Sequence, residues 1–327
     1  MEVNIYKNKN VLVTGGTGLI GIPLVEKLIK LGAYVRVVSL DDGSRCPEGA
    51  EFFNLDLTEF SNCMKVCERQ DYIFQLVGVK GSPAMCAQKP ASFYYPTISF
   101  NTNMLEAARR SGVKKYLYTS SIGVYAPAEV FHEDDVWSTF PSPHDRFAGW
   151  AKRMGELQIE AYKIQYQWND LYIVRPANVF GPWDNFDDQN AMVIPSLIKR
   201  IVAGESPLVC WGDGTPIRDF IFSEDVASDM IAIMQSSETR PINLGSGVGV
   251  TIKEIAENLA SLYSKNLEII WDVTKPKGDQ KRLMETKRAK DLGLTTRTPL
   301  REGLKKTLEW YQQNINIANN RYNPFHD

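Results

Sequence analysis

Short apolar runs separated by amphipathic segments dominate the first half of the chain. These runs are rich in β-branched and aromatic side chains, which is typical of buried strands, and they occupy residues 11–13, 34–40, 52–55, 72–77, 115–119 and 171–174. Segments with helical spacing lie between most of them, as in residues 20–31, 102–110 and 150–165. Alternating strands and helices predict an α/β fold, a doubly wound parallel sheet covered by helices on both faces.

The pattern changes after residue 180. Residues 183–189 are polar and acidic and predict a loop, and later helical segments at 193–203, 252–263 and 300–313 alternate with short strands. We therefore expect a large domain over residues 1–180. A smaller α/β region over residues 181–327 would carry the substrate site, with some segments returning to the first domain. Because no Pro- or Ser-rich linker separates them, the two parts should pack tightly.

Composition excludes several partner classes. The 327 residues are 43% hydrophobic and 23% charged, with a formal net charge of −2. This balance gives no electrostatic signature for nucleic acid or a membrane surface. No apolar run approaches the roughly 20 residues that span a bilayer, and residues 1–10 lack a signal-peptide pattern. We expect a cytoplasmic protein.

The cysteines predict neither disulfides nor a metal site. They are five in number, scattered, and without paired metal-ligand spacing: Cys46, Cys63, Cys67, Cys86 and Cys210. Such a set is typical of free thiols in a reducing compartment.

A glycine-rich turn follows the first predicted strand. Gly16, Gly18 and Gly21 fit the pattern G-x-G-x-x-G directly before the first predicted helix. Glycines at this spacing let the backbone turn sharply and approach a pyrophosphate, which the free N–H groups of the helix N-terminus then bind. An acidic pair about 20 residues on completes the pattern. The first domain is therefore predicted to be a dinucleotide-binding Rossmann domain.

The end of the second predicted strand bears on the choice of cofactor. Asp41 and Asp42 could accept the ribose hydroxyls of the adenosine, which favours NAD. However, Ser39 stands where the usual acid is expected, and Arg45 lies close by in the sequence. Because a serine and an arginine would suit a 2′-phosphate, NADP remains the alternative to NAD.

Several stretches resemble the extended short-chain dehydrogenase/reductase family. The spacing Gly15-x-x-Gly18-x-x-Gly21 is one of them, and the others are residues 56–58, 119–125, 175–182 and 211–220. The resemblance covers almost the whole chain and is nearest to the NAD-dependent nucleotide-sugar epimerase/dehydratase group. Residues 181–220 are particularly similar to GDP-L-fucose synthases. The resemblance implies an enzyme that oxidises or reduces a sugar carbon by hydride transfer, on a GDP-sugar in preference to other nucleotide-sugars.

The same resemblance implies roles for individual residues. Ser121 would bond the reacting sugar hydroxyl and Lys152 the nicotinamide ribose. The cofactor would contact Gly15, Thr17, Gly18, Leu19, Ile20, Gly21, Asp41, Asp42, Asp56, Leu57, Leu76, Val77, Gly78, Thr119, Lys152 and Pro176. The substrate would contact Ser121, Asn178, Val193, Arg218 and Arg282, the arginines gripping its diphosphate. The alternative for Arg218 is an ion pair with Asp219 or Asp225. The alternative for Arg282 is a solvated position on a charged surface.

One departure from the family pattern puts the chemistry in question. The family carries Tyr-x-x-x-Lys, in which the tyrosine exchanges a proton with the substrate, but counting back from Lys152 places Ala148 at that position. Gly123 and Met192 stand where GDP-L-fucose synthases use a cysteine and a histidine for epimerisation. An engineered replacement, a natural member with another acid/base, and a binding protein without turnover all fit.

Three function hypotheses therefore stay open: an epimerase or dehydratase, a 4-keto-sugar reductase, and a catalytically disabled binding protein. A substitute proton carrier should lie on loops at the carboxyl ends of the strands. A water on Ser121 could relay the proton, and the side-chain candidates are Lys80, Cys86, Tyr94, Tyr95, His132, His144 and Asp145.

Two helical segments resemble the pair that forms a four-helix dimer interface in this family. They are residues 96–110 and 150–165, and Met154, Leu157 and Ala161 recur on the second. We expect a homodimer, with ordinary packing of these helices against the sheet as the alternative.

Overall fold

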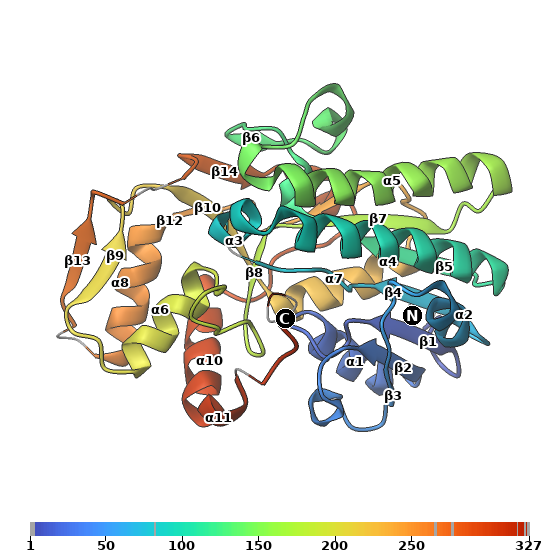
Figure 1. Ribbon diagram of the computed structural model, residues 1–327, viewed down its shortest axis with the longest axis horizontal. Coiled ribbons are helices and arrows are strands. Elements are labelled where there is room, and N and C mark those ends of the chain that lie inside the picture. The colour runs from blue at the N-terminus through green and yellow to red at the C-terminus, as the bar shows by residue number, and fades with distance from the viewer. Residues whose placement is uncertain are drawn as a thin grey trace.

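The computed structural model describes residues 4–81, 83–264, 267–275, 278–318, 320–323 and 325. Figure 1 shows a large sheet flanked by helices at one end and a smaller group of helices and strands at the other. The last stretch of chain runs back between the two parts. In the described part of the chain, none of the helices combines the length and apolar character that crossing a bilayer requires.

The large sheet has seven strands in the order β11-β7-β5-β4-β1-β2-β3, all parallel to their neighbours. The strands are β1 (Asn10–Thr14), β2 (Tyr34–Ser39), β3 (Glu51–Asn54), β4 (Tyr72–Gln75), β5 (Lys115–Thr119), β7 (Leu171–Pro176) and β11 (Ile242–Leu244). The order reverses between β1 and β4, and ligands bind at such a switch point, beyond the carboxyl ends of the strands. This confirms the predicted doubly wound α/β fold.

Helices cover both faces of this sheet. Successive residues of β1 point to opposite faces, so Val11 and Val13 join one core while Leu12 joins another. The first core contains α1 (Gly21–Lys30) and α7 (Ser223–Gln235), which pack on each other. The second contains α2 (Phe60–Cys67), α4 (Pro90–Arg110) and α5 (Arg146–Tyr166). Burial on both faces explains why the strands are continuous apolar runs.

The smaller part surrounds a third core. Its helices are α6 (Val193–Val202), α8 (Ile252–Tyr263) and α10 (Leu300–Gln313). Its strands are β6 (Val130–Phe131), β8 (Asn178–Phe180), β9 (Leu208–Trp211), β10 (Ile217–Phe222), β12 (Gly249–Thr251), β13 (Ile269–Asp272) and β14 (Lys281–Met284). The division at residue 180 stays a prediction. Two elements that follow residue 180, β11 and α7, belong to the large sheet and its first core. One element that precedes it, β6, pairs with β14 in the smaller part.

The remaining α-helices of the described chain are short: α3 (Pro83–Gln88), α9 (Lys287–Asp291) and α11 (Ile315–Ala318). The described chain also has 3-10 helices at Gly43–Arg45, Ile122–Val124, Glu133–Ser138 and Pro143–Asp145. Two helices are longer than the apolar spacing predicts, because α4 begins at Pro90 rather than residue 102 and α5 at Arg146 rather than residue 150. Pro90 occupies the first turn of α4, where its missing N–H costs nothing. The extra turns of α5 bring Asp145 and Ala148 to the edge of the sheet.

Candidate active site

The glycine-rich turn joins β1 to α1 at the switch point. Gly15 has a φ of +66°, which favours glycine, and a Cβ on Gly21 would come within 2.3 Å of the Gly15 carbonyl oxygen. Leu19 and Ile20 lead into α1, and Ile20 is its N-cap without a side-chain cap. The absent side chain of Gly21 lets the start of α1 pack against Gly15 and Gly16, where the Ile22 N–H donates to the Gly18 carbonyl and Pro23 has no N–H. This cradle fits the pyrophosphate of a dinucleotide.

The adenosine end of the crevice is built around Asp41. The Thr17 hydroxyl donates to Asp41 Oδ2 at 2.6 Å and lies 2.7 Å from the Ser39 oxygen. The backbone N–H of Tyr322 donates to Asp41 Oδ1 at 2.7 Å, so both carboxylate oxygens have partners. The neighbouring Asp42 is exposed and caps a short turn by accepting from the Ser44 N–H.

The chain after β4 forms the opposite wall. The N–H groups of Leu76 and Val77 both donate to the Thr14 hydroxyl oxygen, at 3.0 and 3.1 Å. These bonds hold the end of β4 against the glycine-rich turn. Gly78 follows, and a Cβ there would lie 3.7 Å from the Lys152 amine. Nearby, Asp56 accepts from the Thr58 N–H, and Leu57 is buried in the second core.

Lys152 connects α5 to the end of β5. Its amine donates to the Thr119 carbonyl at 2.8 Å and lies over the Tyr118 ring. Burial lowers the pKa of Lys152 to about 8. Beside it, the hydroxyls of Thr119 and Ser120 are buried and make no hydrogen bond within the described part of the chain. Orphaned polar atoms of this kind fit a polar ligand at this edge. Pro176 ends β7 at the same edge.

Ala148, at the position of the family tyrosine, lies half-buried in the first turn of α5. The helix can approach the turn after β5 because Gly149 has no side chain; a Cβ there would lie 2.3 Å from the Gly123 carbonyl oxygen. A Cβ built on Gly123 would lie 3.4 Å from both the Asp145 carboxyl carbon and the Ser121 hydroxyl. A carboxylate thus stands close to the serine predicted to bind the sugar.

The two arginines predicted to grip a diphosphate are neighbours. Arg218 in β10 pairs in register with Arg282 in β14, and burial and then Arg282 lower the pKa of Arg218. Arg282 Nη2 donates to Asp145 Oδ2 at 2.9 Å, while its buried Nε makes no hydrogen bond within the described residues. Arg218 donates to the Ile217 carbonyl, and Arg282 is mostly buried, so a solvated Arg282 is wrong.

The carboxylates suggested as alternative partners of Arg218 are engaged elsewhere. Asp219 accepts from the backbone N–H groups of Ser246 and Gly247, and Asp225 accepts from that of Thr298. Asn178 donates its side-chain amide to the Asp219 carbonyl at 2.8 Å, and Val193 begins α6. The structure therefore places Arg218 with Arg282 and not in either ion pair.

The other proton-carrier candidates lie in less suitable surroundings. Lys80 is ion-paired with Asp184 at 2.6 Å, and Tyr95, His132 and His144 are exposed. Burial, together with the charge of Asp145, raises the pKa of the Cys86 thiol to about 11. Tyr94 lines an open groove of about 440 Å³ between α4 and α5, with Ala91, Arg146, Phe147, Trp150 and Met154. Asp145 is thus the candidate with a contact to the predicted site.

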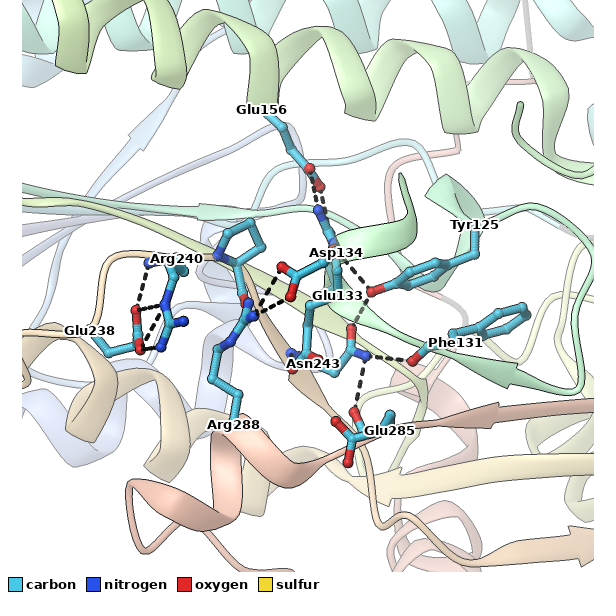
Figure 2. Close-up of polar contacts among 12 residues, drawn as sticks. Tyr125, Phe131, Glu133, Asp134, Glu156, Glu238, Arg240, Asn243, Glu285 and Arg288 are labelled. Atoms are coloured by element: carbon cyan, nitrogen blue, oxygen red, sulfur yellow. Dashed lines mark hydrogen bonds and ion pairs between the residues drawn. The ribbon is translucent and has the colours of Figure 1, made fainter. Parts of the chain in front are cut away.

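A buried polar network supports this edge from below, and sequence reasoning missed it. Arg175 makes two hydrogen bonds to Glu156, at 3.0 and 2.7 Å, and others to the Tyr125 hydroxyl and the Glu133 carbonyl. Figure 2 shows Glu156 reaching in from α5, and Asn243 bridging Tyr125, Phe131 and Glu285. The network ties α5 to β7, β11 and β14. Its one signal was a charged Arg175 inside an apolar strand.

Comparison with known proteins decides the family. The NAD dependent epimerase/dehydratase family matches residues 11–245. The chain belongs to this family. An Arabidopsis thaliana relative named putative GDP-L-fucose synthase 2 is 31% identical, over 95% of this chain and 94% of its own length. GDP-L-fucose synthase of Escherichia coli strain K12 is 28% identical, over 94% and 97%. A solved epimerase from Methanothermobacter thermautotrophicus has a TM-score of 0.86 at 27% identity, covering 96% and 95%.

Membership makes the chain an NAD(P)-dependent enzyme of the epimerase/dehydratase type. The glycine cradle and the orphaned hydroxyls beside Lys152 fit such a cofactor. Among the residues that the structure describes, no group of three or more His, Cys, Asp or Glu could hold a metal ion.

Proposed function

We propose that this NAD dependent epimerase/dehydratase acts on a GDP-linked sugar, at a sugar carbon held between Ser121 and Asp145. The observation that carries the proposal is the adjacent pair Arg218 and Arg282, next to that carboxylate. Two guanidinium groups from neighbouring strands are suited to a diphosphate, since each offers several donors in a fixed plane. The guanine base is proposed from the similarity to GDP-L-fucose synthases.

The chain's own residues would divide the work as follows. Arg218 and Arg282 hold the diphosphate, with the Arg282 Nε as one donor, since it makes no hydrogen bond within the described residues and only a 4.0 Å ion pair with Asp279. Ser121 bonds the reacting hydroxyl, and Lys152 holds the ribose beside Thr119. The nicotinamide, when bound, supplies or accepts the hydride. The matching proton then has to be taken up or released by a side chain close to Ser121.

We propose Asp145 as that proton carrier, in place of the missing tyrosine. Asp145 is the N-cap residue of α5 and stands three positions before Ala148 in the sequence. Its carboxyl carbon and the Ser121 hydroxyl lie at the same distance from the Cβ position of Gly123. The ion pair with Arg282 orients it at this edge.

The reaction is tested with the intact chain, NAD or NADP, and GDP- or UDP-hexoses. NMR spectra should show conversion of a GDP-hexose in preference to its UDP counterpart. If no sugar changes while the cofactor is bound, the chain does not turn over, and the binding-protein hypothesis replaces this one.

A 4-keto-sugar reductase is the second candidate. Gly123 and Met192 stand where epimerising relatives are expected to carry an acid and a base, and neither side chain can move a proton. Loss of absorbance of the reduced nicotinamide in proportion to product would favour the reductase. Conversion at constant absorbance would favour the epimerase.

The proton carrier is tested with Asp145→Asn, which keeps the size and the contact to Arg282. We expect kcat to fall by roughly a hundredfold or more, with cofactor affinity unchanged. Asp135→Asn, an exposed residue of the same chain segment, is the matched control. An unchanged kcat in Asp145→Asn would remove Asp145 from the mechanism. A gain of activity in Ala148→Tyr would indicate a disabled site instead.

We also propose a cytoplasmic homodimer. The five cysteines are free thiols, as in a reducing compartment. Leu157 and Ala161, which recur on α5, face solvent together with Tyr95, Phe147 and Ile164. An exposed apolar face on the α4–α5 pair suits a second copy. Light scattering should give twice the chain mass for the wild type, and the monomer mass for Leu157→Glu.

A further inference from the structure

Tyr118, near the end of β5, lies under the part of α5 that carries Lys152. Its side chain is 2% exposed and belongs to the second core. The Lys152 amine lies over the Tyr118 ring, 5.2 Å from its centroid, and the Tyr118 hydroxyl donates to the Lys152 carbonyl oxygen at 3.2 Å. One buried side chain therefore contacts both the amine and the backbone of the lysine proposed to hold the nicotinamide ribose.

The helix can lie this close to the ring because residue 155 is a glycine. A Cβ built on Gly155 would come within 2.5 Å of the Tyr118 hydroxyl oxygen and of the ring carbon that bears it. A larger residue there would push α5 and the ring apart, since a packed core has no room to absorb it. Gly155 also follows Lys152 by three positions, which places the two on one side of the helix. Tyr118 thus sets the distance between α5 and β5 at the height of Lys152.

The direction of the Tyr118 hydroxyl is set from α4, which lies beside α5 (Figure 1). The side-chain amide of Asn101 on α4 donates to the Tyr118 hydroxyl oxygen at 2.8 Å. Because the amide supplies that donor, the single hydroxyl proton is left for the Lys152 carbonyl. Burial, followed by the charge of Glu156, raises the pKa of Tyr118 well above its ordinary value. The hydroxyl therefore stays protonated and keeps donating.

The Lys152 amine has few other partners. Within the described residues its one hydrogen bond goes to the Thr119 carbonyl oxygen at 2.8 Å. The facing wall adds no side chain at Gly78, where a Cβ would lie 3.7 Å from the amine. Fixing a long lysine side chain costs conformational entropy, and a ring beneath the amine restricts it before any ligand binds. Preorganisation of this kind strengthens the binding of the ligand that the amine contacts.

We propose that Tyr118 is the positioning residue for Lys152, holding its amine where the nicotinamide ribose binds. The inference rests on the role proposed for Lys152 and goes further by naming the side chain that lets the lysine perform it. The hydroxyl fixes the helical turn that carries the lysine, and the ring directs the amine. Because Tyr118 is buried in the core, it acts through Lys152 and not by contact with the cofactor.

The test compares two ligands that differ in the nicotinamide half, by calorimetry. 5′-ADP occupies the adenosine and pyrophosphate half alone, whereas NADH and NADPH, each measured separately, also reach Lys152. Tyr118→Phe keeps the ring and removes the hydroxyl, so it should weaken binding of the preferred dinucleotide about three- to tenfold and leave 5′-ADP unchanged. Tyr118→Leu also removes the ring and should weaken dinucleotide binding by about tenfold or more.

Tyr116→Phe is the matched control. Tyr116 precedes Tyr118 by two positions on the same face of β5, is 1% exposed, and its hydroxyl makes no hydrogen bond within the described residues. This variant should bind both ligands as the wild type does. A double-mutant cycle with Lys152→Met then separates positioning from folding. In the Lys152→Met background, Tyr118→Phe should change the dinucleotide affinity by less than about twofold, because the amine that it positions is gone.

Several outcomes would overturn the inference. An equal loss with and without the lysine amine, or an equal loss for 5′-ADP, would make Tyr118 a purely structural residue. Unchanged dinucleotide affinity in both Tyr118 variants, with a loss in Lys152→Met, would remove Tyr118 alone from the cofactor site. Unchanged affinity in Lys152→Met, or a wild type that binds neither ligand, would refute the proposed role of Lys152 and this inference with it. Tyr118→Phe keeps the core filled, so it decides the matter if Tyr118→Leu fails to fold.

Discussion

Two buried arginines occupy very different surroundings at opposite sides of the crevice. Arg175 lies under the substrate edge with Glu156, the Tyr125 hydroxyl and the Glu133 carbonyl around its guanidinium. Arg45 forms an ion pair with Asp41 at 3.9 Å and lies over the Trp183 ring, and two of its nitrogens have no hydrogen bond within the described residues. Both side chains are almost fully enclosed, at 1% and 3% exposure. Burial alone therefore does not separate a structural cation from a ligand-binding one.

The difference lies in the set of partners. A buried cation whose donors are all met by the protein holds elements together, since breaking one contact strands a charge. A buried cation with open donors costs free energy until a ligand arrives. By this criterion Arg175 fixes α5 against the sheet, whereas Arg45, whose ion pair with Asp41 lies beyond hydrogen-bond distance, is only partly compensated. The comparison can be tested by removing partners and measuring the sign of the change.

The largest effect is expected from Glu156→Leu. Arg175 would then be left without its ion-pair partner in an apolar site, and the free energy of unfolding should fall by about 3–5 kcal/mol. Urea unfolding followed by circular dichroism measures it. The double variant Glu156→Leu with Arg175→Met should recover most of the loss, because no charge is stranded. If Glu156→Leu lowers the free energy of unfolding by less than the removal of an exposed ion pair does, Arg175 is not structural.

Lys152 is intermediate between Arg175 and Arg45 in how far its partners compensate its charge. Its amine donates to one carbonyl oxygen, and no carboxylate is bonded to it within the described chain. Its pKa is about 8 in the folded chain against an ordinary 10.5. The unfolded chain therefore binds more protons between these values, and stability contributed by this group rises as pH increases from about 8 to 10.5. The full change is at most about 3 kcal/mol.

Lys152→Met isolates this dependence, because other titrating groups are common to both proteins. The difference in unfolding free energy between variant and wild type should shrink above pH 8 and vanish near pH 10.5. A constant difference across that range would place the Lys152 pKa at its ordinary value. Cofactor affinity, measured in parallel, reports the role of Lys152 in binding.

The sequence predicted the large sheet well, because strands buried on both faces are continuous apolar runs. It did not predict α7, whose residues Ser223, Asp225 and Asp229 are polar yet buried. Their partners, such as Arg297 and Thr298, come from more than 60 positions away. Long-range satisfaction of polar groups leaves no local periodicity to detect.

The site shows the same limit. The glycine spacing was readable because it is local, and the family motifs placed Ser121, Lys152 and the two arginines. The contact between Asp145 and Arg282 spans 137 positions, and that between Tyr322 and Asp41 spans 281. Asp41, Asp145 and Arg282 were each singled out, but nothing in the sequence paired them with these partners. The acidic pair therefore suggested NAD, while the Tyr322 N–H that bonds Asp41 became visible in the fold alone.

Arg45→Met should change stability in the opposite direction to the loss of Glu156. Without cofactor, removing a buried guanidinium with open donors should leave the free energy of unfolding unchanged or raise it by about 1 kcal/mol. Urea unfolding followed by circular dichroism measures it. A loss of several kcal/mol without ligand would class Arg45 with Arg175.

The smallest effect is expected from Lys305→Met on α10. Lys305 and Glu309 form a pair one helical turn apart at 3.7 Å, with both side chains more than half exposed. Water screens such a pair, so the free energy of unfolding should change by no more than about 0.5 kcal/mol. The same urea titration measures it, and 0.5 M salt should abolish what difference there is. This variant sets the baseline for removing one charge of an ion pair. An effect here as large as that of Glu156→Leu would mean that charge removal itself, rather than the burial and partners of Arg175, causes the loss.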